Sequence, residues 1–447
     1  MISENSKKKY DYAVSIVKIL VKNGYTAYFA GGFVRDRILF KGQAEIGDID
    51  IATNAKPETI AQLFTHTIGV GEQFGVMVVV MGSIPFEVAT FRSDIGIADG
   101  RHPEKVVFTD AREDAKRRDF TINGMFFDPV EERVIDFVGG LEDLDNRVIR
   151  AIGEPQLRFN EDYLRMLRAI RFAARFDYSI DGATWDALVH DAAMISRISP
   201  ERIFAEVDKM VTGKNPHVAL QQLFDSGLLA VILPEVAALS GIEQPPEFHP
   251  EGDVFVHTKL CLEKMIENPD SVLAWSVLLH DIGKPPTMYI AADRVRFNNH
   301  DKVGAEMARD VLRRLKASNA LIDAVGACVD NHMNFMNVTR MRLSTLKKFL
   351  SRPTLLQELD LHFADCMASH GGIDNYHFVK EKLNTMEIGV IKPPPFIGGK
   401  DLIALGLKPG PAFGEILDTV YDLQLEEKIP DKENAIAFVK SRWLEKH

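Results

Sequence analysis

Strand-like sequence is confined to the N-terminal part of this chain, and that restriction constrains the fold more than any other feature. Between residues 26 and about 140, short β-like runs are separated by Gly, Pro and Asp turns: TAYFA (26–30), IDIAT (49–53), VMVVVMG (76–82), PFEVATF (85–91) and RVIDFV (133–138). After about residue 150, helical periodicity replaces them. We therefore expect an α+β fold class, with a small head of mixed β-sheet and helices followed by an all-helical remainder.

Helical periodicity occurs before and after the strand-like region. It predicts one helix over 11–23, before the strands, and further helices over 161–176, 185–195, 200–211 and 217–229. After a break at 241–253, helical patterns continue until about residue 390. The Pro- and Gly-containing stretch GIEQPPEFHPEGD (241–253) has the composition of a linker, and IKPPPFIGGKD (391–401) breaks the pattern again. The expected domains are 1–145, 146–240, 241–390 and 391–447.

Composition excludes several classes of protein. The 447 residues include no apolar run near the ~20 residues of a membrane span, and the N-terminus lacks a signal-peptide pattern. Three scattered cysteines fit a reducing cytoplasm, where we expect the protein to be located. The net charge of −11 argues against wholesale binding to polyanions. Residues 147–175 nevertheless carry seven Arg and three acids, which is either a local nucleic-acid site or a solvated helix face.

Two acidic residues interrupt the strand-like run around IDIAT. Asp48 and Asp50 are two positions apart, so on one strand their side chains would project from the same face. Like charges so placed repel each other, and a divalent cation such as Mg²⁺ removes that cost while retaining coordination sites for phosphate. Glu87, which alternates with apolar residues in PFEVATF, would complete a three-carboxylate metal site.

A glycine pair precedes this acidic strand. FAGGFVRD predicts a strand, then Gly31 and Gly32, then a helix start. Such a turn lets backbone N–H groups approach a triphosphate at a helix N-terminus, and Arg35 would add a cationic contact. Taken alone, each motif is weak. The ordered combination is much more specific, and it resembles the nucleotidyltransferase superfamily that includes DNA polymerase beta.

One branch of that superfamily matches most closely. FAGGFVRD with GDIDIAT, RRDFTING (117–124), DFVGGLEDL (136–144), EDYLRMLRAIRF (161–172) and PERIFAEVDKM (200–210) resemble, in order, motifs A to E of the class II tRNA nucleotidyltransferases and bacterial poly(A) polymerases. The resemblance spans about residues 20–240. It implies a polymerase-beta-like head joined to a helical neck, with tRNA, CTP and ATP as partners.

The resemblance also implies the site residues. Catalysis would depend on Asp48, Asp50 and Glu87, with Mg²⁺ held by Asp48 and Asp50. The nucleotide would be bound by Gly31, Gly32, Arg35, Arg118, Asp119, Asn123, Asp162, Arg165 and Arg168. In the family the aspartate and arginine of E-D-x-x-R pair with the incoming base.

On a continuous helix Asp162 and Arg165 would share one face. A carboxylate and a guanidinium there match the amino group and ring acceptor of cytosine and adenine. The alternative is an ion pair on the helix surface.

Two further stretches bear on the product. VGEQFG (70–75) resembles the G-x-x-F-G stretch of CCA-adding enzymes, whereas the poly(A) polymerases are more basic there. Residues 90–108 lie where the family has its flexible loop, and Asp99 and Arg101 resemble its acidic and basic elements. The expected product is therefore CCA, with addition of the terminal A alone as an alternative and poly(A) synthesis as another.

The helical half carries a second set of chemically capable residues. They are His257, His280, Asp281, His300, His332 and Asp365, and the string HDIGKP at 280–285 resembles the signature of the HD phosphohydrolases. Imidazoles and carboxylates are standard divalent-metal ligands, and two metals would suit phosphoester hydrolysis. The resemblance implies phosphatase, nucleotidase or 2′,3′-cyclic phosphodiesterase activity with an unidentified metal. The alternatives are an inactive HD scaffold, or a chain that is mainly a phosphohydrolase with a regulatory nucleotide-binding head. The oligomeric state stays open.

Overall fold

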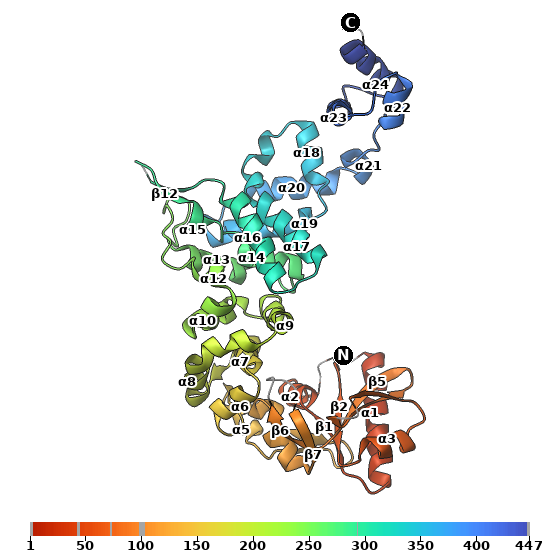
Figure 1. Cartoon of the computed structure of the whole chain (residues 1–447), viewed down its shortest axis with the longest axis vertical. Helices are drawn as coiled ribbons and strands as arrows, with labels where there is room; N and C mark the ends of the chain where they lie inside the picture. Colours follow the sequence, from red (N-terminus) through yellow and green to blue (C-terminus); the bar gives the residue numbers. More distant parts are fainter. Residues whose placement is uncertain (1–2, 43–44, 72–73, 98–102, 293, 445–447) are drawn as a thin grey trace. The chain divides into compact units, whose positions relative to one another are not determined.

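The computed structural model describes residues 3–42, 45–71, 74–97, 103–292 and 294–444. It comprises two compact units, Met1–Pro234 and Glu235–His447. The mixed sheet, drawn from red to orange in Figure 1, belongs to the first unit, and helices dominate the rest of the chain. The predicted α+β class, with a sheet-containing head before a helical remainder, is confirmed.

The head contains a seven-stranded sheet with the strand order β3-β4-β5-β2-β1-β8-β9. The strands are β1 (Ala27–Ala30), β2 (Asp50–Thr53), β3 (Thr67–Gly71), β4 (Val76–Met81), β5 (Ile84–Thr90), β8 (Phe126–Asp128) and β9 (Arg133–Ile135). Neighbours are antiparallel except β2 and β5, which are parallel. All five predicted strands form. β3, β8 and the hairpin β6 (Arg92–Ile97) with β7 (Pro103–Phe108) were not predicted.

Alternation of apolar and polar residues explains how the central strands pack. On β5, Phe86 and Val88 are buried while Glu87 between them is exposed. One face of the sheet packs a cluster that includes Phe91 and Phe126. The head helices are α1 (Glu4–Lys22), α2 (Gly32–Leu39), α3 (Pro57–Leu63), α4 (Ala111–Lys116) and α5 (Gly140–Asp145). Burying one face of β5 thus leaves its acidic residue available to a site.

A helical segment completes the first unit. It contains α6 (Pro155–Glu161), α7 (Leu164–Phe176), α8 (Gly182–Asp191), α9 (Pro200–Val211), α10 (Pro216–Asp225) and α11 (Leu228–Ile232), with a short parallel pair of β10 (Val148–Ile149) and β11 (Ser179–Ile180). The predicted continuous helix over 161–176 is wrong. Asp162 has an extended backbone between α6 and α7, and its carboxylate accepts a hydrogen bond from the Leu164 N–H at 3.1 Å.

The second unit is helical apart from one small hairpin. Its elements are α12 (Pro234–Ala237), α13 (Val254–Lys264), α14 (Ser271–Leu279), α15 (Lys284–Thr287), the hairpin β12 (Met288–Ile290) with β13 (Val295–Phe297), α16 (His300–Arg314), α17 (Asn319–Asn331), α18 (Leu343–Leu350), α19 (Leu355–Ala368), α20 (Asp374–Thr385), α21 (Ile388–Ile391), α22 (Gly399–Ala404), α23 (Ala412–Leu425) and α24 (Lys432–Val439). Within the described ranges, no helix is both long and apolar enough to cross a membrane.

The segment of residues 241–253, which its composition predicts to be a linker, lies within the second unit, because the two units divide after residue 234. The Gly241 N–H donates to Asp253, and Glu243 and Asp253 form an antiparallel bridge. Its Pro and Gly residues form turns at the wall of a pocket, and composition alone cannot distinguish such turns from a flexible connection.

Candidate active sites

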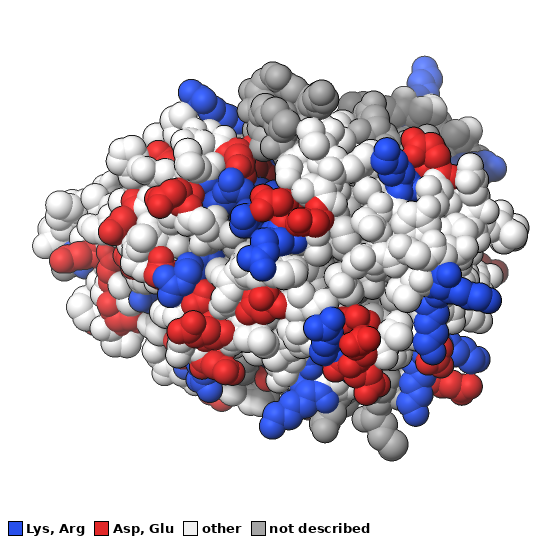
Figure 2. Space-filling model, turned by 90° about the horizontal axis from the view of Figure 1, so that it is seen from below, with Lys and Arg blue, Asp and Glu red and all other residues white. Residues whose placement is uncertain are grey.

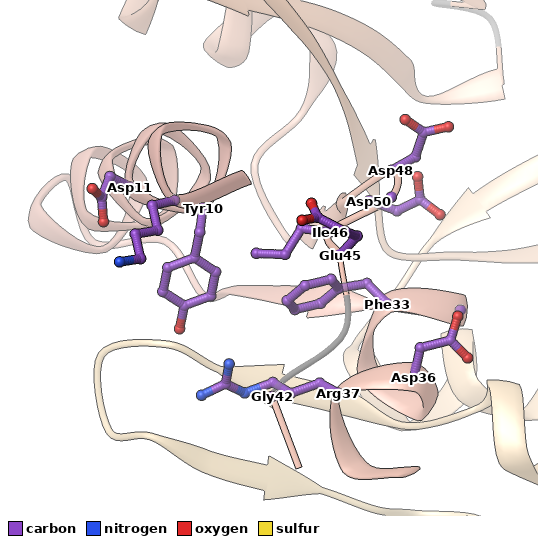
Figure 3. Close-up of a pocket in the computed structure, with 13 residues that line it drawn as sticks. Tyr10, Asp11, Phe33, Asp36, Arg37, Gly42, Glu45, Ile46, Asp48 and Asp50 are labelled. Carbon is purple, nitrogen blue, oxygen red and sulfur yellow. The ribbon is translucent and has the colours of Figure 1, made fainter. Parts of the chain in front are cut away.

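The acidic pair lies at the start of β2, not within it. Asp50 is the first residue of the strand, and Asp48 precedes it, so their proximity does not come from strand alternation as predicted. The side chain of Asp48 is 99% exposed, and its Oδ1 lies 3.0 Å from Lys9 Nζ on α1. Figure 3 shows both carboxylates at the edge of a cavity of about 540 Å³, which Tyr10 and Phe33 also line.

Glu87 lies beside Asp50 in the sheet. β2 and β5 are parallel with Ile51 opposite Val88, so the preceding residues, Asp50 and Glu87, are neighbours. Desolvation by the surrounding chain raises the pKa of Asp50, the Glu87 carboxylate raises it further, and Arg118 opposes the rise. Carboxylates that repel one another in this way fit a divalent cation, because the cation removes the repulsion. The structure thus brings together the three acids predicted from distant stretches.

The turn before α2 requires glycine. Gly31 has a φ of +68°, and a Cβ there would lie 3.4 Å from Arg118 Nη1 and 3.6 Å from Asp50 Oδ2. Arg118 in turn donates from Nη2 to Asp114 Oδ2 at 3.0 Å. Asp114 was not selected from the sequence. The positive φ of Gly31 thus explains the glycine, and Arg118 and Asp50 lie in van der Waals range of this turn, just before α2 begins at Gly32.

Four of the predicted nucleotide-binding residues form one internal network. Arg35 is 3% exposed and donates from Nη1 to Asn123 Oδ1 at 2.5 Å. Asn123 donates to Asp119 at 3.0 Å, and Arg168 donates from Nη2 to Asp119 at 2.6 Å. The guanidinium of Arg35 also lies 4.7 Å from the Phe176 ring centroid. Arg35 is thus buried, and its contacts run from α2 to Asn123 and to Phe176 of α7.

Asp162 and Arg165 each have partners of their own. Asp162 Oδ2 accepts from Arg202 Nη2 at 2.6 Å. Arg165 donates from Nη1 to Glu161 at 2.6 Å and from Nη2 to the Arg117 carbonyl at 3.1 Å. Arg202, in the stretch that resembles motif E, and Arg117 were not selected from the sequence. The two predicted base-reading side chains are thus oriented by neighbours, although they do not share a helix face.

Most arginines of residues 147–175 are paired with acids. The pairs are Arg150 with Asp143 and Asp181, Arg158 and Arg165 with Glu161, Arg168 with Asp119, Arg171 with Glu206, and Arg175 with Asp36. The molecular face in Figure 2 likewise shows blue and red side chains interspersed rather than a patch of one sign. The local surplus of charge is therefore largely neutralised. Asp99 and Arg101, predicted to act in a flexible loop, lie outside the described residues.

The second unit gathers its predicted histidines at one centre. Three of them direct Nδ1 at a backbone carbonyl, 2.7–2.9 Å away: His280 at Val277, His300 at Phe297 and His332 at Val329. A carbonyl can only accept, so each Nδ1 carries the proton and each Nε2 offers a lone pair. The Nε2 atoms of His300 and His332 lie 3.2 Å apart. Burial and the neighbouring His300 and His280 lower the pKa of His332 to about 3, so its ring is neutral and suited to a metal.

Asp281 lies between two groups of these side chains. Its Oδ2 is 3.2 Å from His280 Nε2 and 3.8 Å from His257 Nε2, while its Oδ1 is 3.7 Å from His300 Nε2. The neighbouring His280 and the Lys284 ammonium hold the pKa of Asp281 well below its usual range against the effect of burial. Asp365 Oδ1 lies 3.1 Å from His257 Nε2. All six predicted residues therefore meet in one place, and Asp281 lies between His280 and His257 on one side and His300 on the other.

Residues from the supposed linker complete this centre. Glu251 Oε1 lies 2.6 Å from His257 Nδ1 and 3.0 Å from His249 Nδ1. Gln244 accepts from Lys284 Nζ. A pocket of about 370 Å³ opens here, with Phe248 and the 294–298 stretch among its lining residues. Sequence spacing gave no signal for Glu251, because it precedes α13 in a loop whose course depends on tertiary contacts.

Comparisons with known proteins agree with this geometry. Residues 27–150 match the family model "Poly A polymerase head domain", residues 177–239 match "Probable RNA and SrmB- binding site of polymerase A", and residues 254–368 match "HD domain". Families of the first and third kinds generally use divalent metals. The fold and the two sites define the class: a nucleotidyltransferase head with an HD domain in the same chain.

Relatives along the whole chain identify the family. The CCA-adding enzyme of Lactococcus lactis subsp. cremoris (strain MG1363) is 32% identical, covering 99% of this chain and 98% of the relative. That of Geobacillus sp. (strain WCH70) is 44% identical over 50% of this chain and 54% of the relative. The Bacillus stearothermophilus CCA-adding enzyme in complex with CTP has a TM-score of 0.74 at 28% identity, with 97% of each chain covered. This chain belongs to the family of CCA-adding enzymes, which are tRNA nucleotidyltransferases.

Proposed function

We propose that the protein adds C, C and A to the 3′ end of tRNA from CTP and ATP without a nucleic-acid template. The observation that carries this proposal is the convergence of Asp48, Asp50 and Glu87 beside the Gly31 turn. Similarity to CCA-adding enzymes over the whole chain supports it, as does the CTP complex of the Bacillus stearothermophilus neighbour. Residues 1–145 would carry the transfer chemistry and residues 146–240 the base selection.

The head residues would have distinct roles in nucleotidyl transfer. Asp48 and Asp50, with Glu87 beside them, would hold two Mg²⁺ ions, whose positive charge would favour attack by the tRNA 3′-hydroxyl and departure of pyrophosphate. The turn at Gly31 and Gly32 presents backbone N–H groups to the triphosphate, and Arg118 supplies positive charge beside Asp50. The role of Arg35 and Asn123 is to hold this turn against α7 through Asp119 and Arg168.

Base selection is assigned to Asp162 and Arg165. A carboxylate accepts from the amino group that cytosine and adenine share, and a guanidinium donates to the adjacent ring nitrogen. Arg202 orients Asp162, and Glu161 orients Arg165. Because these partners fix both side chains before substrate arrives, little conformational entropy is lost on binding.

The direct test uses purified full-length protein and tRNAs lacking CCA, CA or A. With labelled CTP or ATP and sequencing of the products, all three should be completed and extension should stop after A. Completion of only the last tRNA would leave the A-adding alternative, and long A tails on unrelated RNA would indicate a poly(A) polymerase. Asp50→Asn should lower addition by at least about 100-fold, since it removes a carboxylate at the reacting centre.

We propose in addition that the HD centre hydrolyses phosphoesters with a divalent metal. The inward Nε2 atoms of His280, His300 and His332 and the bridging position of Asp281 support this role. These residues would hold a divalent metal, which would supply Lewis-acid activation for attack of water on a phosphoester. A 2′,3′-cyclic phosphate at an RNA end would block nucleotide addition, so such hydrolysis would restore a substrate for the head. Release of phosphate or opening of 2′,3′-cyclic AMP, abolished by a chelator, is the test.

A further inference from the structure

A buried cysteine faces the HD centre from the same helix as one of its histidines. Cys261 follows His257 by four residues on α13, so the two side chains share one face of the helix. Cys261 is 0% exposed, and its Sγ lies 3.3 Å from His257 Nε2. The resemblance to HD proteins rests on histidines and aspartates and gives this thiol no role.

The surrounding atoms have the spacing of a coordination shell. One ligand atom from each of His257, Cys261, His280 and Asp365 can be chosen so that all four lie within 4.8 Å of one another. His257 Nε2 is 3.1 Å from Asp365 Oδ1. Ligand atoms 2.0–2.3 Å from a tetrahedral metal are themselves about 3.4 Å apart. Small side-chain adjustments would therefore bring all four onto one ion.

An unpartnered nitrogen points to the same ion. His280 is 1% exposed, and its Nδ1 is occupied by the Val277 carbonyl, so its Nε2 is an acceptor; that Nε2 lies 3.2 Å from Asp281 Oδ2, itself an acceptor, and receives no hydrogen bond. A buried lone pair without a donor costs free energy. A metal bound between His280 Nε2 and Cys261 Sγ would satisfy it. This observation is independent of the cysteine.

We propose that Cys261 is a thiolate ligand of the HD metal, beside His257, His280 and Asp365. The inference rests on the proposal that the HD centre holds a divalent metal. On binding, the Cys261 S–H proton is released to solvent and an Sγ–metal bond forms. A thiolate is a soft ligand, so it biases this position toward Zn²⁺ over Mg²⁺ or Mn²⁺, whereas the position of His300 and His332 has only nitrogen and oxygen ligands.

Cobalt substitution tests the proposal in the full-length chain. Co²⁺ bound to a thiolate has an intense near-ultraviolet charge-transfer band, and Co²⁺ bound only to nitrogen and oxygen has visible d–d bands without it. The wild type should show the band, and Cys261→Ser and Cys261→Ala should lose it. Cys328→Ser is the matched control, because Cys328 is also fully buried, on α17, and should retain the band. Acidic residues of the head contribute no thiolate band.

Each outcome separates the two proposals. Loss of the band in both Cys261 variants, with d–d bands retained, supports thiolate ligation and reports that the centre is still folded. The wild type could instead show d–d bands that His280→Ala removes, but no charge-transfer band. That result overturns ligation by Cys261 and leaves the HD metal proposal in place. If His280→Ala removes no Co²⁺ band, both the HD metal and its ligation by Cys261 are overturned. A second readout is affinity: Cys261→Ala should weaken Zn²⁺ binding more than Mn²⁺ binding, and equal weakening contradicts the proposal.

Discussion

Among single residues, Asp119 connects the sheet-containing head to α7. Its carboxylate accepts from Arg168 and from Asn123, and these partners lower its pKa to about 2 despite the opposing effect of burial. The ionised form of Asp119 is thus stabilised more strongly in the folded protein than in the unfolded chain, which lacks these partners. Stability from this source is present above the ordinary aspartate pKa of 3.8 and is lost as the pH falls from about 4 toward 2.

Asp119→Asn should therefore destabilise the protein at neutral pH by about 2 kcal/mol, and the difference from wild type should shrink below about pH 4. Urea-unfolding midpoints measured between pH 3 and pH 7 check this. Asp177→Asn is the control, because Asp177 is an exposed residue at the end of α7. A difference between wild type and Asp119→Asn that stays constant down to pH 3 would contradict the assigned cause.

Glu251 positions His257 from the loop before α13. Its Oε1 accepts a hydrogen bond from His257 Nδ1 at 2.6 Å, which leaves Nε2 to face the centre. Glu251→Gln should weaken divalent-metal binding by about 10–100-fold while leaving tRNA nucleotide addition intact, and isothermal titration with Zn²⁺ measures the change. Glu247→Gln in the same segment is the control, because its side chain is 75% exposed. Equal affinities for the two variants would show that Glu251 does not act through His257.

At the scale of elements, a close approach between α15 and α16 places His300. Gly283, just before α15, has no room for a side chain, since a Cβ would lie 2.1 Å from the His300 carbonyl and 2.6 Å from the Gly304 nitrogen. Both neighbours are backbone atoms, which cannot move without shifting α16. The glycine of the HDIGKP string thus serves packing, which in turn fixes the position of His300, a proposed metal ligand.

Gly283→Ala should destabilise the second unit by about 1–3 kcal/mol or more and weaken metal binding, because the start of α16 must move. Thermal unfolding and Co²⁺ titration measure the two effects. Gly414→Ala on α23 is the matched control: a Cβ there meets nothing within 4 Å, so no loss is expected and helix propensity predicts a gain of up to about 1 kcal/mol. Tolerance of both substitutions would mean that α16 adapts freely.

The break between α6 and α7 shows where pattern reading failed at this scale. Apolar periodicity from 161 to 176 predicted one helix, and α7 does bury Leu164, Leu167 and Ile170 on one face. Periodicity does not detect the interruption at Asp162, since an aspartate that hydrogen-bonds a nearby backbone N–H replaces helical geometry over a single residue. Asp162 therefore reaches Arg202 from an extended backbone.

At the scale of the whole molecule, the two sites lie in separate compact units, Asp50 in the first and Asp281 in the second. Asp50→Asn should abolish nucleotide addition and spare 2′,3′-cyclic AMP hydrolysis, and Asp281→Asn should do the reverse. Parallel assays of both activities on each variant check this, with unfolding curves confirming that each remains folded. Loss of both activities in either variant would contradict two independent centres.

The fold class, the family and most of the residues that converge could be predicted from motif order, apolar periodicity and residue chemistry, because these are local properties of the chain. How those residues are held depends on tertiary contacts. Arg202 reaches Asp162, Arg168 pairs with Asp119 and Arg171 pairs with Glu206, and in each case 35 or more positions of the chain separate the two residues. Such contacts depend on how the chain folds back on itself, and a linear pattern does not encode the distance between segments far apart in the chain.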